Sequence, residues 1–338
     1  MTATMAASEA AIVVSLERLG LLKPGDPVVM TPLAGGVSSD IWRVQLTTGP
    51  VCVKRALPRL KVRQVWEAPV ERNRFEWLWL QTVSNCSPES VPRLIADSPP
   101  DQLFVMEYLD PIHHPVWKSE LCASRIDTQF AAQVGRALAR IHAFTANRAD
   151  LAEQFSTDSF FHALRLEPYL EATARRHPDR ADALLGLASI TASTRRALVH
   201  GDISPKNILV GPRGPVFLDA ECAWFGDPAF DLAFCLNHLL LKCLWIPASA
   251  PRYLESFAAL ASAYLDAVTW EDRQAIESRV AALLPGLLLA RVDGKSPVEY
   301  LTEEVQREVV RRVARELLGS PVPMLSDVSN AWKTEIRT

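Results

Sequence analysis

Apolar and polar residues alternate in two short runs near the start of the chain. Trp42, Val44 and Leu46 take every second position of the first run, and Val51 and Val53 do the same in the second. Alternation with a period of two is typical of strands that bury one face, and the segment TTGP between the runs is rich in turn-forming residues. The pattern predicts a β-hairpin that follows a double-glycine turn.

Three further elements are predicted in this part of the chain. Residues 1–20 hold a short apolar run between two glutamates, with no basic leader, so they are expected to form a helix and not a signal peptide. A second helix is predicted around residues 70–83 and an extended segment over residues 101–110. Together with the hairpin, these elements indicate a small sheet accompanied by helices.

The pattern changes to a helical one beyond residue 110. Apolar residues recur at spacings of three and four over residues 130–141, which is the period of one buried helix face. Charged runs elsewhere suit solvated helix faces, and strands are expected only around residues 197–218. We therefore expect an α+β fold with two domains, a sheet-rich lobe over residues 1–110 and a mainly helical lobe over residues 111–338.

Composition narrows the class of partner. The 338 residues include 36 basic and 39 acidic ones mixed along the chain, with a formal net charge of −3. Nucleic acid calls for a basic face or stripe, so it is not an expected partner. No run approaches the ~20 apolar residues that span a bilayer, and the cysteines show neither zinc spacing nor a disulfide framework. We expect a cytoplasmic protein without a membrane partner; the pattern carries no signal for oligomeric state.

Polar residues interrupt the apolar runs of the segment ALVHGDISPKNILV, residues 197–210. Apolar arms on either side of a Gly/Pro turn at residues 211–215 predict a hairpin that brings Asn207 and Asp219 to its open end. Neighbouring strands lie ~5 Å apart, so an amide oxygen and a carboxylate there can share Mg²⁺, which also prefers phosphate oxygens. Asp202 enters the same end from the preceding loop. These residues predict phosphoryl transfer from a nucleotide.

The same residues carry a family resemblance. His200-Gly201-Asp202 with Asn207, followed by Asp219, resembles the catalytic and metal-binding segments of the aminoglycoside phosphotransferase and choline kinase superfamily. Protein kinases keep the same spacing from Asp to Asn but have Arg where Gly201 stands. The resemblance implies a two-lobed protein-kinase-like fold with ATP and Mg²⁺ between the lobes. It assigns catalysis to Asp202, the metal to Asn207 and Asp219, and a structural hydrogen-bonding role to His200.

The resemblance extends into the first lobe. The segment LAGGVSSDIWRV is similar to the family's nucleotide loop, in which Gly35 and Gly36 let backbone amides approach phosphates and Ser38 and Ser39 add donors. Lys54 in VCVKRA matches the lysine that binds phosphates, although a lysine taken alone also suits a solvated edge strand. The match implies that this lobe binds ATP.

Further site residues follow from the resemblance. Lys54 calls for an acidic partner on the next helix; Glu76 is favoured because its setting is similar to methylthioribose kinases, and Glu71 is the competitor. The segment FVMEYL resembles the linker that binds adenine through the backbone of Glu107 and Leu109. In the second lobe, the resemblance makes Glu221 an additional metal-site residue and Asp231 a buried brace for the catalytic loop.

The spacing after Asp219 indicates which kind of molecule accepts the phosphoryl group. Asp231 follows Asp219 by only twelve residues, which leaves no room for the activation segment that protein kinases use to hold a peptide. A small hydroxylated acceptor of the aminoglycoside, sugar or amino alcohol type is therefore expected, with a slight preference for the methylthioribose side. Arg291 and Lys295 suit either a capped turn between helices or a basic clamp on the substrate.

A second class of function remains open at this stage. A kinase-like protein that has lost catalysis can serve as a nucleotide-binding scaffold, and its usual mark is the loss of the lysine, the base or the metal ligand. Lys54, Asp202 and Asp219 are all present. An enzyme, a small-molecule kinase, is therefore favoured over a pseudokinase.

Overall fold

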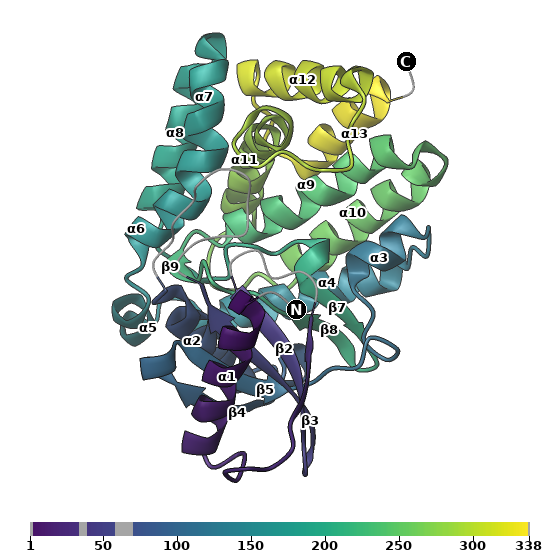
Figure 1. The fold of residues 1–338 in the computed structure, drawn as a ribbon. Helices are drawn as coiled ribbons and strands as arrows, with labels where there is room; N and C mark the ends of the chain where they lie inside the picture. Colours follow the sequence, from purple (N-terminus) through teal and green to yellow (C-terminus); the bar gives the residue numbers. More distant parts are fainter. Residues whose placement is uncertain (1–2, 34–38, 58–69, 337–338) are drawn as a thin grey trace. The chain divides into compact units, whose positions relative to one another are not determined.

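The computed structural model describes residues 3–33, 39–57 and 70–336. The chain divides into two compact units, Met1–Pro111 and Ile112–Thr338, and Figure 1 follows the chain through them. The division lies one residue beyond the domain boundary expected from the sequence. Within the described ranges, none of the helices combines the length and apolar character that a bilayer crossing requires.

The first unit contains an antiparallel sheet of five strands in the order β1-β2-β3-β5-β4. The strands are β1 Val29–Pro32, β2 Ser39–Leu46, β3 Gly49–Ala56, β4 Leu94–Ser98 and β5 Leu103–Glu107. The predicted hairpin is confirmed, because β2 pairs with β3 and places Trp42 opposite Val53. Its turn is shorter than expected, since pairing continues to Leu46 and Gly49.

Helices accompany this sheet as the sequence predicted. They are α1 Ala3–Arg18 and α2 Arg72–Ser84, with the 3₁₀ turns η1 Pro88–Ser90 and η2 Pro99–Asp101. Ile12 and Leu16 of α1 are fully buried in one apolar cluster with Trp42, Val44 and Val53 of the sheet. The alternation read from the sequence therefore marks the core face, because successive strand side chains point to opposite sides.

The second unit is mainly helical, as expected. Its α-helices are α3 Trp117–Cys122, α4 Thr128–Thr145, α5 Ala149–Gln154, α6 Asp158–Phe161, α7 Ala172–Arg176, α8 Ala181–Ser193, α9 Ala229–Trp245, α10 Ala250–Leu265, α11 Arg273–Asp293, α12 Glu304–Gly319 and α13 Leu325–Glu335. A π-helix, η3 His162–Glu171, joins α6 to α7, and 3₁₀ turns lie at η4 Pro178–Arg180, η5 Pro205–Asn207 and η6 Pro247–Ser249. The strands are β6 Ala197–Val199, β7 Ile208–Gly211, β8 Gly214–Phe217 and β9 Trp224–Gly226.

Helix α9 forms the centre of this unit. Every residue from Ala229 to Leu244 is buried, including Asp231 and Lys242. The predicted apolar face over residues 130–141 is also confirmed, because Phe130 and Leu138 of α4 are buried. A helix that is buried all round must bring its polar residues into contact with polar partners or ligands, so the polar side chains of α9 are of functional interest.

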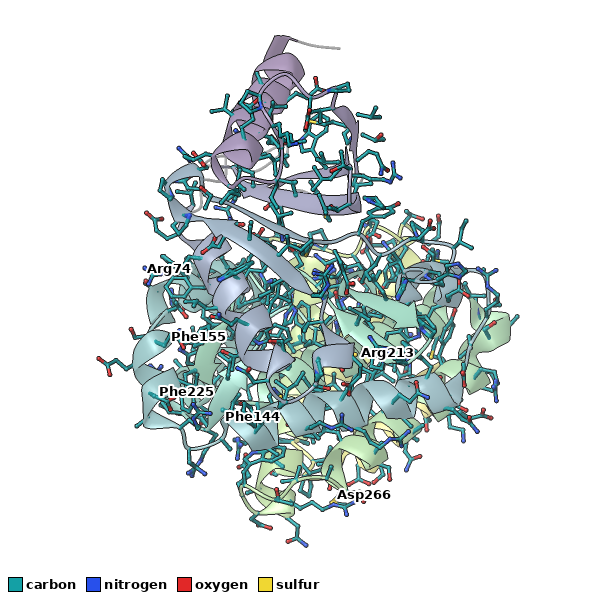
Figure 2. All side chains as sticks on the ribbon, turned by 90° about the horizontal axis from the view of Figure 1, so that it is seen from below. Arg74, Phe144, Phe155, Arg213, Phe225 and Asp266 are labelled. Atoms are coloured by element: carbon teal, nitrogen blue, oxygen red, sulfur yellow. The ribbon has the colours of Figure 1, made fainter. Side chains whose placement is uncertain are left out.

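Two small two-stranded sheets support the segment between α8 and α9. Strand β6 pairs with β9, and the backbone N–H of Phe225 in β9 donates to the carbonyl oxygen of Phe155 at 3.3 Å, two residues that Figure 2 labels side by side. Strand β7 pairs with β8. This scaffold fixes both ends of the loop that contains Asp202.

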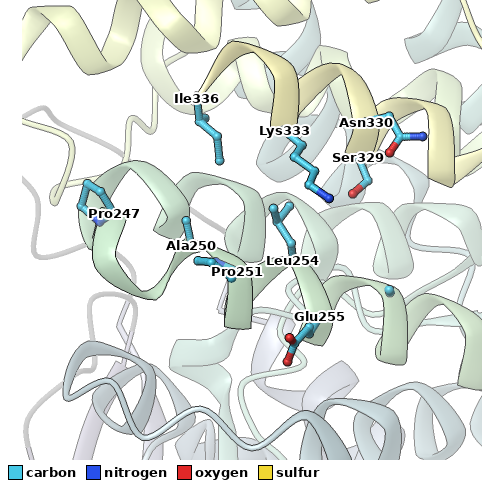
Figure 3. Close-up of a pocket in the computed structure, with 10 residues that line it drawn as sticks. Pro247, Ala250, Pro251, Leu254, Glu255, Ser329, Asn330, Lys333 and Ile336 are labelled. Carbon is cyan, nitrogen blue, oxygen red and sulfur yellow. The ribbon is translucent and has the colours of Figure 1, made fainter. Parts of the chain in front are cut away.

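A surface groove of about 570 Å³ runs between α10 and α13. Leu254 of α10 points toward Lys333 and Ile336 at the other wall (Figure 3), and Glu255 also lines the groove. The predicted site residues of this unit lie instead on the β6–β9 segment, α9 and α11. The groove is therefore a separate feature of the surface.

Candidate active site

The loop after β6 depends on a glycine. Gly201 adopts a φ of 79°, in the left-handed region, and a Cβ at this position would lie 2.7 Å from the carbonyl oxygen of Cys222. Backbone strain and a steric clash would both oppose a larger residue. The departure from the protein-kinase arginine at Gly201 thus has a local cause.

Gly201→Ala is expected to lower the free energy of unfolding by about 2–5 kcal/mol, from the positive φ and the overpacking against Cys222 together. Urea titration followed by circular dichroism measures the change. Gly186→Ala is the matched control, because a Cβ there meets no atom within 4 Å in helix α8, and the helix gains up to about 1 kcal/mol. Equal unfolding midpoints for the two variants would contradict the steric argument.

The carboxylate of Asp231 accepts hydrogen bonds from the backbone of the turn at Gly201. Its Oδ1 accepts the backbone N–H of Gly201 at 2.8 Å and its Oδ2 accepts the backbone N–H of His200 at 2.7 Å. Nε2 of His142 lies 3.3 Å from the same Oδ2, and Nδ1 of His142 lies 2.8 Å from the hydroxyl of Tyr264. The carboxylate is fully buried. These contacts fit the brace role that the sequence assigns to Asp231.

His200 connects the loop to the hairpin. Its Nδ1 accepts the backbone N–H of Asp202 at 3.1 Å, so Nε2 carries the proton that is donated to the carbonyl oxygen of Leu218 at 3.1 Å. Burial lowers the pKa of His200, although Asp231 and other carboxylates oppose that shift. A neutral imidazole with both nitrogens engaged acts as a structural link and not as a proton carrier.

The predicted hairpin is confirmed in β7 and β8, where Ile208 pairs with Phe217. The N–H of Leu218 donates to the backbone oxygen of Asn207 at 2.9 Å, so Asn207 and Asp219 lie at the same open end. Nδ2 of Asn207 donates to the carbonyl oxygen of Asp202 at 3.0 Å, which presents Oδ1 as the amide's acceptor. Amide and carboxylate oxygens at one hairpin end are a donor set that fits Mg²⁺.

The Asp202 carboxylate is almost completely enclosed, with 8% of its side chain exposed. Its Oδ2 lies 3.2 Å from Nη2 of Arg165 and 3.1 Å from Nζ of Lys206. Burial acts to raise the pKa of Asp202, but Lys206 and Arg165 outweigh it and hold the pKa below its ordinary value. Asp202 is therefore ionised, and its two cationic partners hold the carboxylate in one orientation.

Arg165 is a site residue that the sequence did not reveal. It projects from the π-helix η3, where Pro168 interrupts regular helical bonding. Its Nε donates to the carbonyl oxygen of Gly201 and its Nη1 donates to the carbonyl oxygen of Leu164 at 2.6 Å. No local pattern distinguishes Arg165 from the other arginines, because its partners lie some 36 residues away in the chain.

Lys54 of the first unit lies on β3, a central strand of the sheet, and not on an edge. Its Nζ is 2.6 Å from Oε2 of Glu76 on α2, and the two side chains are only 3% and 2% exposed. Glu71, the alternative partner, is exposed just before α2. The carboxylate of Glu76 holds the ammonium group of Lys54 in a fixed position, and phosphate binding by Lys54 stays a prediction.

Other predicted residues have varied surroundings. Gly35, Gly36 and Ser38 lie outside the described residues, whereas Ser39 is buried at the start of β2. Glu107 ends β5, where its Oε1 accepts the backbone N–H of Arg93 at 2.8 Å, and Leu109 is half-buried beyond it. Glu221 is buried two residues after Asp219.

The sequence placed Arg291 and Lys295 around Asp293-Gly294 between helices, and α11 does end there, with Gly294 as its C-cap. Helix α11 continues to Asp293, so Arg291 lies in its last turn and is buried. Lys295, beyond the helix end, lies 2.7 Å from Oε1 of Glu167. Asp293, the last residue of α11, forms ion pairs with Arg311 and His177.

Comparison with known proteins finds kinases among the proteins of similar sequence. A methylthioribose kinase of Pectobacterium carotovorum is 28% identical over 266 residues, an alignment that covers 69% of this chain and 65% of that protein. The chain therefore spans about 65% of the length of the curated relatives it matches first.

Solved structures show the fold. An amicoumacin kinase in complex with AMP-PNP, Ca²⁺ and its ligand superposes with a TM-score of 0.61 at 15% identity, covering 97% of this chain and 99% of that one. A choline/ethanolamine kinase family protein of Mesorhizobium loti gives a TM-score of 0.55 at 16% identity, covering 98% and 99%. The predicted kinase-like α+β fold is confirmed.

The family is shown by a match along the sequence itself. The profile of the phosphotransferase enzyme family aligns with residues 29–270, from the start of β1 to beyond α10. Because this match covers well over half of the chain and includes both Lys54 and the Asp202 loop, the chain belongs to the phosphotransferase enzyme family.

Proposed function

We propose that this chain is an ATP-dependent kinase that transfers the γ-phosphoryl group to a hydroxyl of a small molecule. The observation that carries the proposal is the position of Asp202. Its carboxylate is buried, and its backbone oxygen accepts a hydrogen bond from Asn207 at the end of the β7–β8 hairpin. The family and the kinase relatives support it. The pseudokinase alternative draws no support from the described residues, which retain the lysine, the base and the hairpin ligands.

Asp202 serves in this proposal as the residue that receives the substrate hydroxyl. The hydroxyl oxygen attacks the γ-phosphorus, the bond from that phosphorus to the ADP oxygen breaks, and the hydroxyl proton passes to Asp202. A low pKa makes Asp202 a weak base, which suits a loose transition state in which the proton leaves late. Orientation of the hydroxyl is then its main contribution.

Asn207 and Asp219 are the proposed ligands of Mg²⁺, with Glu221 as an additional acidic residue. When bound, Mg²⁺ would neutralise part of the negative charge on the phosphates of ATP. Lys54, held by Glu76 at 2.6 Å, is proposed to bind the ATP phosphates. The glycine loop at Gly35 and Gly36 and the backbone at Glu107 and Leu109 remain predictions for phosphate and adenine binding.

The proposal is tested by ADP formation across a panel of amino alcohols, sugars including methylthioribose, aminoglycosides and amino-acid alcohols. We expect ADP to form with one acceptor class and the product to gain one phosphoryl group by mass spectrometry. Asp202→Asn serves as the blank. ADP formed at the same rate by the blank, or without any acceptor, would contradict the assignment.

A further inference from the structure

Two buried cations of the second unit have no acidic partner. Lys242 of α9 is 1% exposed and Arg291 of α11 is 8% exposed. Among the described residues, no carboxylate lies within ion-pair distance of either one. Glu299, whose charge acts on both cations, is already paired with Lys118. Buried charges are normally paired, so this excess of positive charge calls for an explanation.

Contacts with neighbouring side chains satisfy these cations only in part. Arg291 Nη1 donates to the hydroxyl of Tyr169 at 3.2 Å and to the backbone oxygen of Ser296 at 2.5 Å, but its Nε is buried without an acceptor among the described residues. Lys242 Nζ lies 4.5 Å from the ring centre of Tyr300 and 4.9 Å from that of Trp245. Aromatic faces attract a cation but do not neutralise it.

The pKa of Lys242 reflects the lack of an acidic partner. Burial is the largest cause that lowers its pKa to about 8, and the positive charges of Lys118 and Arg291 lower it further, whereas Cys122 and Glu299 act in the opposite direction. The same excess acts on His238, whose pKa is lowered by burial and by surrounding cations. The region is electropositive from several elements at once.

Arg291 is connected to the proposed catalytic residue Asp202 through Tyr169 and Arg165. The ring centre of Tyr169 lies 5.7 Å from Cζ of Arg291 and 6.0 Å from Cζ of Arg165. Arg165 in turn lies 3.2 Å from the carboxylate of Asp202. Arg291 is therefore joined to Asp202 by consecutive side-chain contacts.

A second row of contacts reaches Lys242. Arg165 packs over the ring of Phe234 at 5.8 Å, and that ring lies 5.6 Å from the ring of His238. Nδ1 of His238 lies 3.3 Å from the hydroxyl of Tyr300, over which Lys242 lies. Phe234, His238 and Lys242 are spaced by four residues along α9 and share one face. Both cations thus lie on rows that start at Asp202.

We propose that Arg291 and Lys242 bind an anionic group of the phosphoryl acceptor, a carboxylate or a phosphate monoester, while the acceptor's hydroxyl contacts Asp202. The inference rests on the proposed kinase function and adds the substrate class. An anion would supply the missing acceptor to Arg291 Nε and the missing counter-charge to Lys242. The same cations would repel the ammonium groups of aminoglycosides, choline and ethanolamine, so these are disfavoured acceptors.

Matched acceptors that differ by one anionic group test the proposal. Suitable pairs are glycerate and glycerol, gluconate and sorbitol, and ribose 5-phosphate and ribose, with choline and an aminoglycoside as cationic members. We expect the kcat/KM of the anionic member to exceed that of its neutral partner at least 100-fold in one pair. Carboxylate and phosphate pairs distinguish the two sources of charge.

Substitutions at Arg291 and Lys242 test whether these two residues cause the preference for an anionic acceptor. Arg291→Met and Lys242→Met should each reduce the preference for the anionic acceptor at least tenfold, mainly through its KM, with the KM for ATP unchanged. Arg291→Lys and Lys242→Arg keep the charge and should retain most of the preference. Lys333→Met, on the exposed side of α13, is the matched control and should change neither constant.

Stability separates a binding role from a structural one. Removal of an unpaired buried cation should raise the melting temperature of Lys242→Met in the absence of ligand, whereas a structural lysine would lower it. With the nucleotide site filled by saturating ADP, inorganic phosphate at 10 mM should raise the melting temperature of the wild-type protein and not that of the two Met variants. A lowered melting temperature for Lys242→Met, or equal phosphate stabilisation of all proteins, would overturn the proposal.

Failure of the inference is distinguishable from failure of the proposed function. If neutral or cationic acceptors are phosphorylated as well as anionic ones, the kinase assignment stands and the anion site is wrong. If no acceptor yields ADP above the Asp202→Asn blank, the kinase assignment falls. The phosphate-dependent melting shift still decides whether Arg291 and Lys242 bind an anion.

Discussion

Asp202→Asn should lower kcat by a factor of about 10²–10⁴, which is the range that general bases contribute, while the KM for ATP changes by less than about threefold. Asparagine fills nearly the same volume but cannot accept the proton of the substrate hydroxyl, and its amide directs donors toward Arg165 and Lys206, which bind the carboxylate at 3.2 and 3.1 Å. Steady-state kinetics with saturating acceptor gives the loss directly.

The loss should be specific to catalysis. Asp182→Asn, an exposed aspartate at the start of α8, is the matched control and should leave kcat unchanged. Protection by the non-hydrolysable nucleotide AMP-PNP in a thermal melt should be equal for wild type and Asp202→Asn. A kcat within threefold of wild type would remove Asp202 from its assigned role, and loss of nucleotide protection would show that the substitution acts on binding.

Sequence reasoning reached the elements that local pattern determines. The β2–β3 hairpin follows from alternation around a turn, and the β7–β8 hairpin follows from two short apolar arms around glycine and proline. Asn207 and Asp219 could be placed together for the same reason, because antiparallel pairing fixes which residues meet at the open end.

Contacts between distant segments could not be read in this way. Arg165 meets Gly201 from 36 residues away, and His142 meets Asp231 from 89 residues away. The π-helix that presents Arg165 departs from the regular period of 3.6, so periodicity gives no information on its direction.

The burial of charged side chains also could not be predicted from the sequence. Nothing in the sequence pattern marks Lys242 or Arg291 as buried, yet α9 and the end of α11 are buried on all sides. Tertiary packing, and not helix propensity, decides the surroundings of both cations.

Asp231→Asn should lower the free energy of unfolding by about 3–5 kcal/mol, comparable to the loss of one member of a buried charged network. Oδ1 and Oδ2 of Asp231 accept the N–H groups of Gly201 and His200 at 2.8 and 2.7 Å, and Nε2 of His142 lies at 3.3 Å. An asparagine amide has one oxygen and one NH₂ group, so one backbone donor would face another donor in a site with no exposure to water.

The turn at Gly201 depends on both acceptors, so the substitution should also displace Asp202 and lower kcat at 25 °C, where part of the protein remains folded. Urea unfolding followed by circular dichroism measures the stability change, and kinetics on the folded fraction measures the second effect. The exposed Asp182→Asn variant again serves as the control for an Asp-to-Asn change without buried partners. An unfolding midpoint for Asp231→Asn equal to that of wild type would mean that the two backbone bonds contribute nothing net, and Asp231 would then be a neighbour of the catalytic loop and not its support.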